Sequence, residues 1–125
     1  MVLLRREDAP VFETPNGVMR QFVSPSSQAT EMAVWEVEMK AGAAGPEHRM
    51  SSDQLHRSLR GRWRVIVDGR TELVEEGDAV FIRAGALRRI APDGDDGARA
   101  LVVSLAGGRA TMPDGQDRGV PPWSG

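Results

Sequence analysis

The amino-acid sequence predicts a single all-β domain, and three observations lead to this prediction. Short runs of alternating apolar and polar residues recur along the chain, turns rich in glycine separate them, and no long stretch has the period of an amphipathic helix. The chain of 125 residues is about as long as one domain. Many short strands with frequent turns are typical of a β-sandwich or a β-barrel.

The first elements are expected in residues 1–25, where strands would flank a turn at Thr14–Gly17. A clearer strand follows over Met32–Met39, because large apolar side chains alternate there with Glu36 and Glu38. The glycine-rich segment Ala41–Pro46 is then expected to be a loop. These elements lead into the barrel core, which we expect to span about residues 30–106.

The middle of the chain repeats the pattern of short strands and turns. Asp68-Gly69 and Glu76-Gly77-Asp78 are turn signals between them. The tail, residues 107–125, is rich in Gly and Pro, so we expect an irregular arm whose anchor is Trp123. The predicted strands of this part are Gln54–Leu59, Trp63–Val67, Ala79–Ile82, Arg88–Ala91 and Arg99–Leu105.

Composition narrows the class of protein. The formal net charge is −2 and acidic residues are interleaved with basic ones, so no basic field is present to attract nucleic acid or a membrane surface. Cysteine is absent, and no run of about 20 apolar residues or signal peptide is apparent. We therefore expect a cytoplasmic protein. Of the 16 basic residues only Lys40 is a lysine, which indicates GC-rich codons and a bacterial source.

Two sets of residues have a spacing that stands out. The first set reads Gly42, five residues, His48, one residue, Met50, three residues, Gln54, six residues, Gly61. The second set reads Gly77, five residues, Arg83, one residue, Gly85, two residues, Arg88.

This pair of spacings resembles the two sequence motifs of the cupin superfamily. The first family motif reads Gly, five residues, His, one residue, His, three or four residues, Glu, six residues, Gly. The second reads Gly, five residues, Pro, one residue, Gly, two residues, His, three residues, Asn. The glycines and gaps of this chain agree with the family, but of the four usual metal ligands only His48 is kept. The resemblance implies a cupin-like barrel, that is, a double-stranded β-helix or jelly roll, without the standard metal site.

Strand alternation predicts which side chains face the interior. If Gln54 takes the inward position of the family's glutamate, then His56 and Ser58 also face inward, because side chains at i and i+2 share a face of a strand. The resemblance adds two groups to this interior row. His48, Met50 and Arg88 would face the lumen, and Trp35 and Trp63 would form apolar walls.

The interior residues are candidates for distinct roles. His48 and His56 are candidate catalytic acids or bases, because imidazole titrates near neutral pH. Arg88 is a fixed cation where the family has a histidine, so it would repel a divalent metal and attract a carboxylate, phenolate or enolate. The remaining candidates for substrate binding are Gln54, Met50, Trp35, Trp63 and Ser58.

Each candidate also has a structural alternative. His56 would then be a hydrogen-bonded core residue, Met50 would fill space, and Arg88 would form an ion pair with Glu47 or another acid. The sequence alone does not choose between the two readings.

Three classes of function remain open. The first, which we favour, is an enzyme without a cofactor that performs acid–base chemistry of the isomerase, cyclase or dehydratase type on an anionic small molecule. It looks like the small stand-alone cupins associated with polyketide tailoring in secondary metabolism. The second is a metal-dependent enzyme such as a dioxygenase, in which His48, Gln54 and His56 hold a divalent transition metal. The third is a cupin that binds a small ligand without turning it over.

The same strands carry a prediction about assembly. Leu55 and Leu59 would lie on the outer face of the barrel, where a row of apolar residues is rarely left in water. We therefore expect a homodimer, which the family resemblance also favours.

Overall fold

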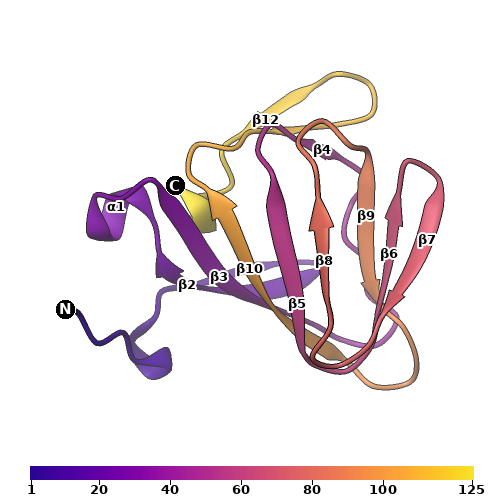
Figure 1. Cartoon of the computed structure of the whole chain (residues 1–125), viewed down its shortest axis with the longest axis horizontal. Helices are drawn as coiled ribbons and strands as arrows, with labels where there is room; N and C mark the ends of the chain where they lie inside the picture. The colour runs from indigo at the N-terminus through magenta and orange to yellow at the C-terminus, as the bar shows by residue number, and fades with distance from the viewer.

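A computed structural model describes residues 1–125, and its largest element is a six-stranded antiparallel sheet (Figure 1). From edge to edge the strands are β1 (Val11–Thr14), β2 (Gly17–Val23), β3 (Met32–Met39), β10 (Ala98–Leu105), β5 (Gln54–Arg60) and β8 (Ala79–Ile82). The all-β prediction is confirmed. Helical residues are confined to α1 (Pro25–Gln28) and two 3₁₀ turns, η1 (Arg6–Asp8) and η2 (Pro122–Ser124), and none of these elements is long and apolar enough to span a membrane.

The opposite wall of the barrel is built from two three-stranded sheets. One contains β7 (Arg70–Val74), β6 (Trp63–Val67) and β9 (Arg88–Pro92), and the other β12 (Asp117–Gly119), β11 (Ala110–Thr111) and β4 (Arg49–Met50). They meet at a bridge between His48 and Arg88. The His48 N–H donates to the Arg88 carbonyl at 3.0 Å, and the Arg88 N–H donates to the His48 carbonyl at 2.8 Å.

Residues 107–125 differ from the expected irregular arm. Strand β11 pairs with both β4 and β12, so the tail extends the second wall of the barrel. Its end is fixed as well, because Gln21 Nε2 donates to the Trp123 carbonyl at 2.9 Å and Ser26 Oγ donates to the Gly125 carbonyl at 2.7 Å. Trp123 packs against the core, as the sequence indicated. The prediction of an irregular arm was wrong because β11 pairs with β4, which lies far away in the chain.

The core lies between the two walls and follows the predicted alternation. Trp35, Val37 and Met39 of β3 are buried on the inner face, and Val102 of β10 is completely buried beside them. Trp63 and Val65 of β6 complete the core from the other wall. Both walls therefore contribute large apolar side chains to one core.

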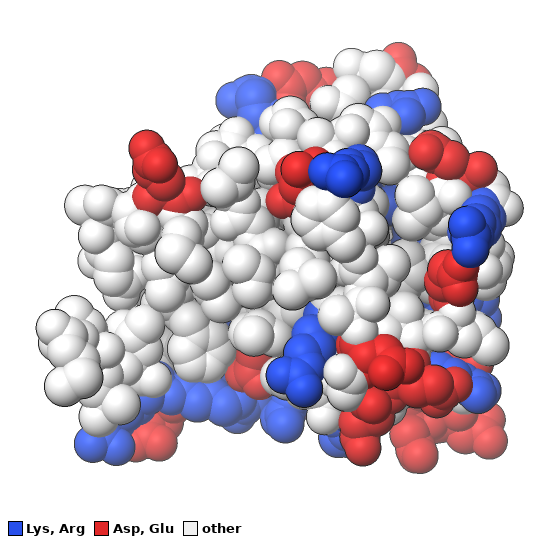
Figure 2. All heavy atoms as spheres, viewed as in Figure 1, with Lys and Arg blue, Asp and Glu red and all other residues white.

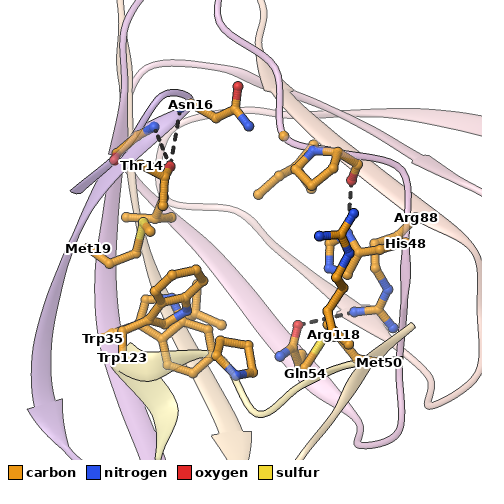
Figure 3. Close-up of a pocket in the computed structure, with 18 of the residues that line it drawn as sticks. Thr14, Asn16, Met19, Trp35, His48, Met50, Gln54, Arg88, Arg118 and Trp123 are labelled. Carbon is orange, nitrogen blue, oxygen red and sulfur yellow. Dashed lines mark hydrogen bonds between the residues drawn. The ribbon is translucent and has the colours of Figure 1, made fainter. Parts of the chain in front are cut away.

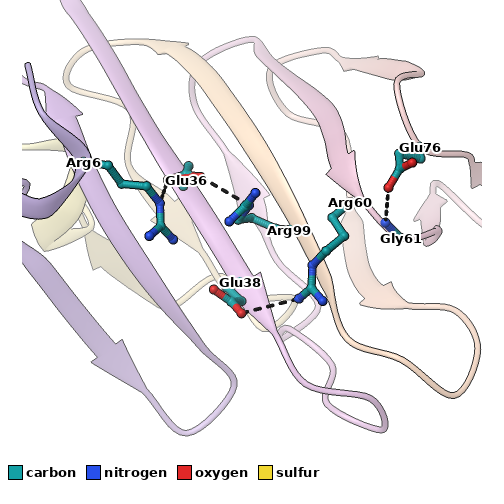
Figure 4. A network of polar contacts seen from close by, with 7 residues as sticks. All are labelled: Arg6, Glu36, Glu38, Arg60, Gly61, Glu76 and Arg99. Carbon is teal, nitrogen blue, oxygen red and sulfur yellow. Dashed lines mark hydrogen bonds and ion pairs between the residues drawn. The ribbon is translucent and has the colours of Figure 1, made fainter.

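The outer side of the six-stranded sheet carries a cluster of ion pairs (Figure 4). Glu36 is buried and accepts from Arg6 Nε at 2.9 Å, while its other oxygen lies 3.4 Å from Arg99 Nε. Glu38 lies 3.5 Å from Arg60 and is far more exposed. The Arg6 contact ties the N-terminal 3₁₀ turn to the middle of the sheet.

Exposed apolar side chains gather on the same outer face, toward β5 and β8. Leu55 lies between Val103 of β10 and Phe81 of β8 in the strand register, and Leu55, Leu59 and Phe81 are 36%, 37% and 52% exposed. Figure 2 shows a broad uncharged area on this face, with charged groups around it along the lower, upper and right edges. The predicted outward direction of Leu55 and Leu59 is confirmed.

Candidate functional site

A cavity of about 490 Å³ lies between the six-stranded sheet and the opposite wall (Figure 3). Its size is in the range of small-molecule sites. The two tryptophans, Trp35 and Trp123, lie on the opposite side of it from Arg88. Six of the eight residues predicted for the site line this cavity: Trp35, His48, Met50, Gln54, His56 and Arg88.

The other two predicted residues lie outside the large cavity. Trp63 and Ser58 are 3% and 2% exposed and line a second cavity of about 10 Å³. His56 lines both cavities, so it stands in the wall between them. Alternation along β5 therefore places Gln54, His56 and Ser58 on the inner face, but only the first two reach the large cavity.

Arg88 is the most deeply buried charged group of the site, at 2% exposure. Its guanidinium donates from Nε to the Ala86 carbonyl at 3.2 Å, from Nη2 to the Arg83 carbonyl at 3.1 Å and from Nη1 to Gln54 Oε1 at 3.1 Å. These bonds use three of the five N–H groups of an arginine. One N–H on each terminal nitrogen stays free.

The predicted alternative of an ion pair for Arg88 is not found, because no carboxylate lies within ion-pair distance of its guanidinium. Burial lowers the pKa of Arg88 to about 10, and the charge of Asp68 acts in the opposite direction. The guanidinium is therefore still protonated at neutral pH, and its charge is not neutralised by a neighbour.

His48 is held in one tautomer. Its Nδ1 lies 2.8 Å from the Pro46 carbonyl, which can only accept, so the proton is on Nδ1 and Nε2 has a free lone pair. Burial lowers the pKa of His48, the bond to Pro46 raises it, and the charge of Arg88 lowers it further. The backbone bridge between the two residues explains this coupling, since residues directly paired across strands present their side chains on one face.

His56 makes no hydrogen bond to another protein group. Burial, followed by the charge of Arg88 and that of His48, lowers the pKa of His56 to about 4. Both imidazoles are therefore neutral at pH 7, because burial and the fixed cation of Arg88 both disfavour their protonated forms. Neutral imidazoles accept a proton on one nitrogen and donate from the other.

The lining contains no aspartate or glutamate. A second cation, Arg118 of β12, also lines the cavity; it is exposed and has no hydrogen-bond or ion-pair partner. The electrostatic potential inside the cavity is thus positive, and the rest of the cavity surface is largely apolar. Sequence reasoning missed Arg118 because it lies in the Gly- and Pro-rich tail, outside both motifs and any recognisable strand pattern.

The residues that would hold a metal were tested against the same geometry. No group of three or more His, Cys, Asp or Glu side chains is arranged to hold a metal ion. Gln54 Oε1, the oxygen donor of the alternative metal site, accepts from Arg88, so a guanidinium stands where that oxygen would meet a cation. Neutral imidazoles can ligate a metal, but a guanidinium at Gln54 Oε1 and a lining without a carboxylate do not fit a divalent cation at this position.

Comparison with solved structures gives the same fold for several proteins. The polyketide cyclase RemF from Streptomyces resistomycificus has a TM-score of 0.72 at 23% identity, covering 84% of this chain and 79% of that one. A predicted oxalate decarboxylase from Thermotoga maritima has a TM-score of 0.75 at 15% identity, covering 83% and 98%. A cupin 2 domain-containing protein from Halorhodospira halophila has a TM-score of 0.74 at 22% identity, covering 89% and 81%. These similarities concern the fold.

Comparison with curated proteins gives no match. The family model for the Cupin domain matches residues 35–104, which is more than half of the chain and includes both motifs, the six cavity residues predicted from the sequence and the strands that carry them. The chain therefore belongs to the cupin family.

Proposed function

We propose that this protein is an enzyme that performs acid–base chemistry, without a metal ion, on an anionic small molecule bound in the barrel. Isomerisation, cyclisation and dehydration are the reaction types that need such equipment and no redox cofactor. The observation that supports the proposal is the pairing of an unneutralised, buried Arg88 with two neutral imidazoles in a cavity that contains no acid.

The free N–H groups of Arg88 give the cavity its affinity for an anion. A guanidinium with two donors available is suited to a carboxylate or to a carbonyl oxygen that becomes negative during reaction. Gln54 adds a donor, because its amide oxygen is engaged with Arg88 while its NH₂ group has no partner. The apolar surface around Trp35 and Trp123 would hold the body of the molecule, which favours an aromatic or polyketide-like substrate.

The chemistry that follows is proton transfer next to a carbonyl group. His48 Nε2 takes a proton from a carbon beside the carbonyl, and Arg88 and Gln54 stabilise the resulting enolate oxygen. Return of the proton at another carbon completes an isomerisation. Attack of the enolate carbon on a second carbonyl, followed by protonation of the new alkoxide, closes a ring. Neither route needs an oxidant or a reductant.

The proposal is tested with aromatic and β-keto compounds as substrates. His48→Ala and His56→Ala should each lower turnover by about a hundredfold or more with little change in binding. Arg88→Ala should weaken binding and turnover together, and Arg88→Lys should restore them only in part because the fork of donors is lost. Arg89→Ala is the matched control, because Arg89 lies on the same strand and is exposed. If His48→Ala and His56→Ala are both folded and both keep full turnover, the acid–base proposal is wrong.

Two further outcomes would lead to the alternatives. Stoichiometric metal in the purified protein, with activity lost in chelator and restored by the metal, would favour the metal-dependent enzyme. Tight binding of anionic compounds that depends on Arg88, without turnover of any of them, would favour a ligand-binding role. The fold similarity to a polyketide cyclase is the reason to include β-keto substrates in the first set.

A further inference from the structure

A buried hydrogen-bond donor beside the site has no partner in the protein. Trp63 is only 3% exposed, and its indole Nε1 is inaccessible to solvent and makes no hydrogen bond in the protein. Buried polar atoms in folded proteins nearly always have a partner, and internal water supplies it where protein groups do not. Trp63 Nε1 is one of two such buried atoms, and the other, Arg99 Nε, lies near Glu36 on the outer face.

The second cavity of the barrel lies against this tryptophan. It measures about 10 Å³, which is close to the space that one water molecule needs. Three of its lining residues carry polar atoms, namely His56, Ser58 and Trp63, and the remaining lining is apolar. A cavity of this size with three polar neighbours meets the usual conditions for a single ordered water, which typically makes about three hydrogen bonds.

The donors and acceptors around this cavity can be balanced. Trp63 Nε1 can only donate. Ser58 Oγ donates its proton to the Gly61 carbonyl at 2.6 Å, so toward the cavity it can only accept. A water that accepts from Trp63 and donates to Ser58 has one hydrogen left. The ring nitrogen of His56 accepts this hydrogen only if that nitrogen is unprotonated. With a protonated nitrogen the water would accept twice and leave its second hydrogen buried without an acceptor, which is costly.

We propose that one buried water joins Trp63, Ser58 and His56 and fixes the tautomer of His56, so that Trp63 is a positioning residue for the site. The nitrogen of His56 toward the water accepts, and the proton is held on the other ring nitrogen, where it can be donated into the large cavity. His48 has the opposite arrangement, because its Nδ1 proton is bound by Pro46 and its free Nε2 can accept.

The two histidines then have complementary roles. His48 supplies an acceptor for a proton, and His56 supplies an N–H donor that acts with Arg88 on a developing oxyanion. This division of roles rests on the proposed function, whereas the water and the tautomer do not. A tryptophan outside the large cavity would thus affect the chemistry only through the orientation and protonation of His56.

The water site is tested by NMR on the wild-type protein and two variants. In the wild type, the Trp63 indole proton should show a contact with a long-lived water, and the ¹⁵N shifts of His56 should report a single neutral tautomer. Trp63→Phe removes the donor and should turn His56 into a mixture of tautomers. Val74→Ala is the control, because Val74 lines the same cavity but has no polar atom, and it should leave the single tautomer in place.

The kinetic effect of Trp63→Phe should be a decrease in turnover of about ten- to a hundredfold with KM nearly unchanged, the loss typical when a partner that orients a functional histidine is removed. A wild-type indole proton without a water contact, or a His56 tautomer that is the same in wild type and Trp63→Phe, would overturn the inference. The wild-type measurement tests the water site even if the variant does not fold.

The outcomes also separate this inference from the proposed function. A fixed His56 tautomer together with full turnover in His56→Ala would leave the water site standing and remove the catalytic role of His56. A large loss of turnover in His56→Ala, together with a His56 tautomer that is unchanged in Trp63→Phe, would support the catalytic role of His56 and overturn the water site.

Discussion

Removing the charge of Arg88 should raise the pKa of both cavity histidines, and this can be measured without a substrate. The pKa of His56 is about 4, compared with 6.5 for an ordinary histidine. The difference corresponds to about 3 kcal/mol between the neutral and the protonated imidazole. Burial is the largest cause and Arg88 the second, so Arg88→Met should raise the pKa of His56 and leave it below 6.5.

The assay is an NMR titration of the two histidine rings in the wild type and three variants. In Arg88→Met the pKa of His48 should rise as well, because the charge of Arg88 is one of the causes that lower it. Arg88→Lys keeps a positive charge at this position and should leave both pKa values low. Arg83→Gln is the control, since Arg83 is exposed and its side chain lies near Asp53 rather than in the cavity.

One result would refute the electrostatic reasoning. If Arg88→Met is folded and both histidines still titrate as in the wild type, then burial alone keeps them neutral, and Arg88 does not set their protonation. Equal shifts in Arg88→Met and Arg88→Lys would lead to the same conclusion, because a lost hydrogen-bond arrangement rather than a lost charge would then be responsible.

Three further predictions concern stability and assembly. His56 becomes protonated near pH 6.5 in the unfolded chain and only near pH 4 in the folded chain, so the free energy of unfolding should decrease as the pH is lowered through this window, by up to about 3 kcal/mol from this residue. In denaturant titrations at pH 7 and pH 4, His56→Gln should remove this contribution to the pH dependence. Glu36→Gln should destabilise the fold by about 1–3 kcal/mol because it breaks a buried pair, while Glu38→Gln, at an exposed pair, should cost less than about 1 kcal/mol. Light scattering should give a dimer that Leu55→Glu with Phe81→Glu converts to a monomer; a monomeric wild type would contradict this.

The strands and the inner face of the barrel were predictable because their signals are local. Alternation of apolar and polar side chains needs only neighbouring residues, and it placed Gln54, His56 and Ser58 on the inner face of β5. The spacing of the motif glycines fixes the turns, as at Gly85, whose φ of 82° is easy only for glycine. Alternation brought Gln54 and His56 to the cavity, whereas the family resemblance supplied the inward direction of His48, Met50 and Arg88.

Depth along a strand and pairing across the chain were not predictable in this way. Alternation shows which face of a strand a side chain occupies, but not its position along the barrel. Ser58 and Trp63 were therefore expected at the substrate site, although they line the small second cavity. Strand β11 has only two residues, and its partner β4 lies far away in the sequence. Arg118 enters the site only through that pairing, so no local pattern could have identified it.

The way in which Arg88 is held supports a role beyond packing. The tight turn before β9 directs the carbonyls of Arg83 and Ala86 at the guanidinium, and Gln54 holds it from β5. An arginine that served the fold alone would be expected to have an acidic partner or a full set of acceptors, because unpaired buried donors are costly. Arg88 has neither, and its two free N–H groups remain in a cavity that contains neutral histidines and no acid. Those groups can donate to water or to an anion that enters the cavity. We therefore expect an anion rather than a metal ion to occupy this part of the cavity, because the protein itself places a positive charge there.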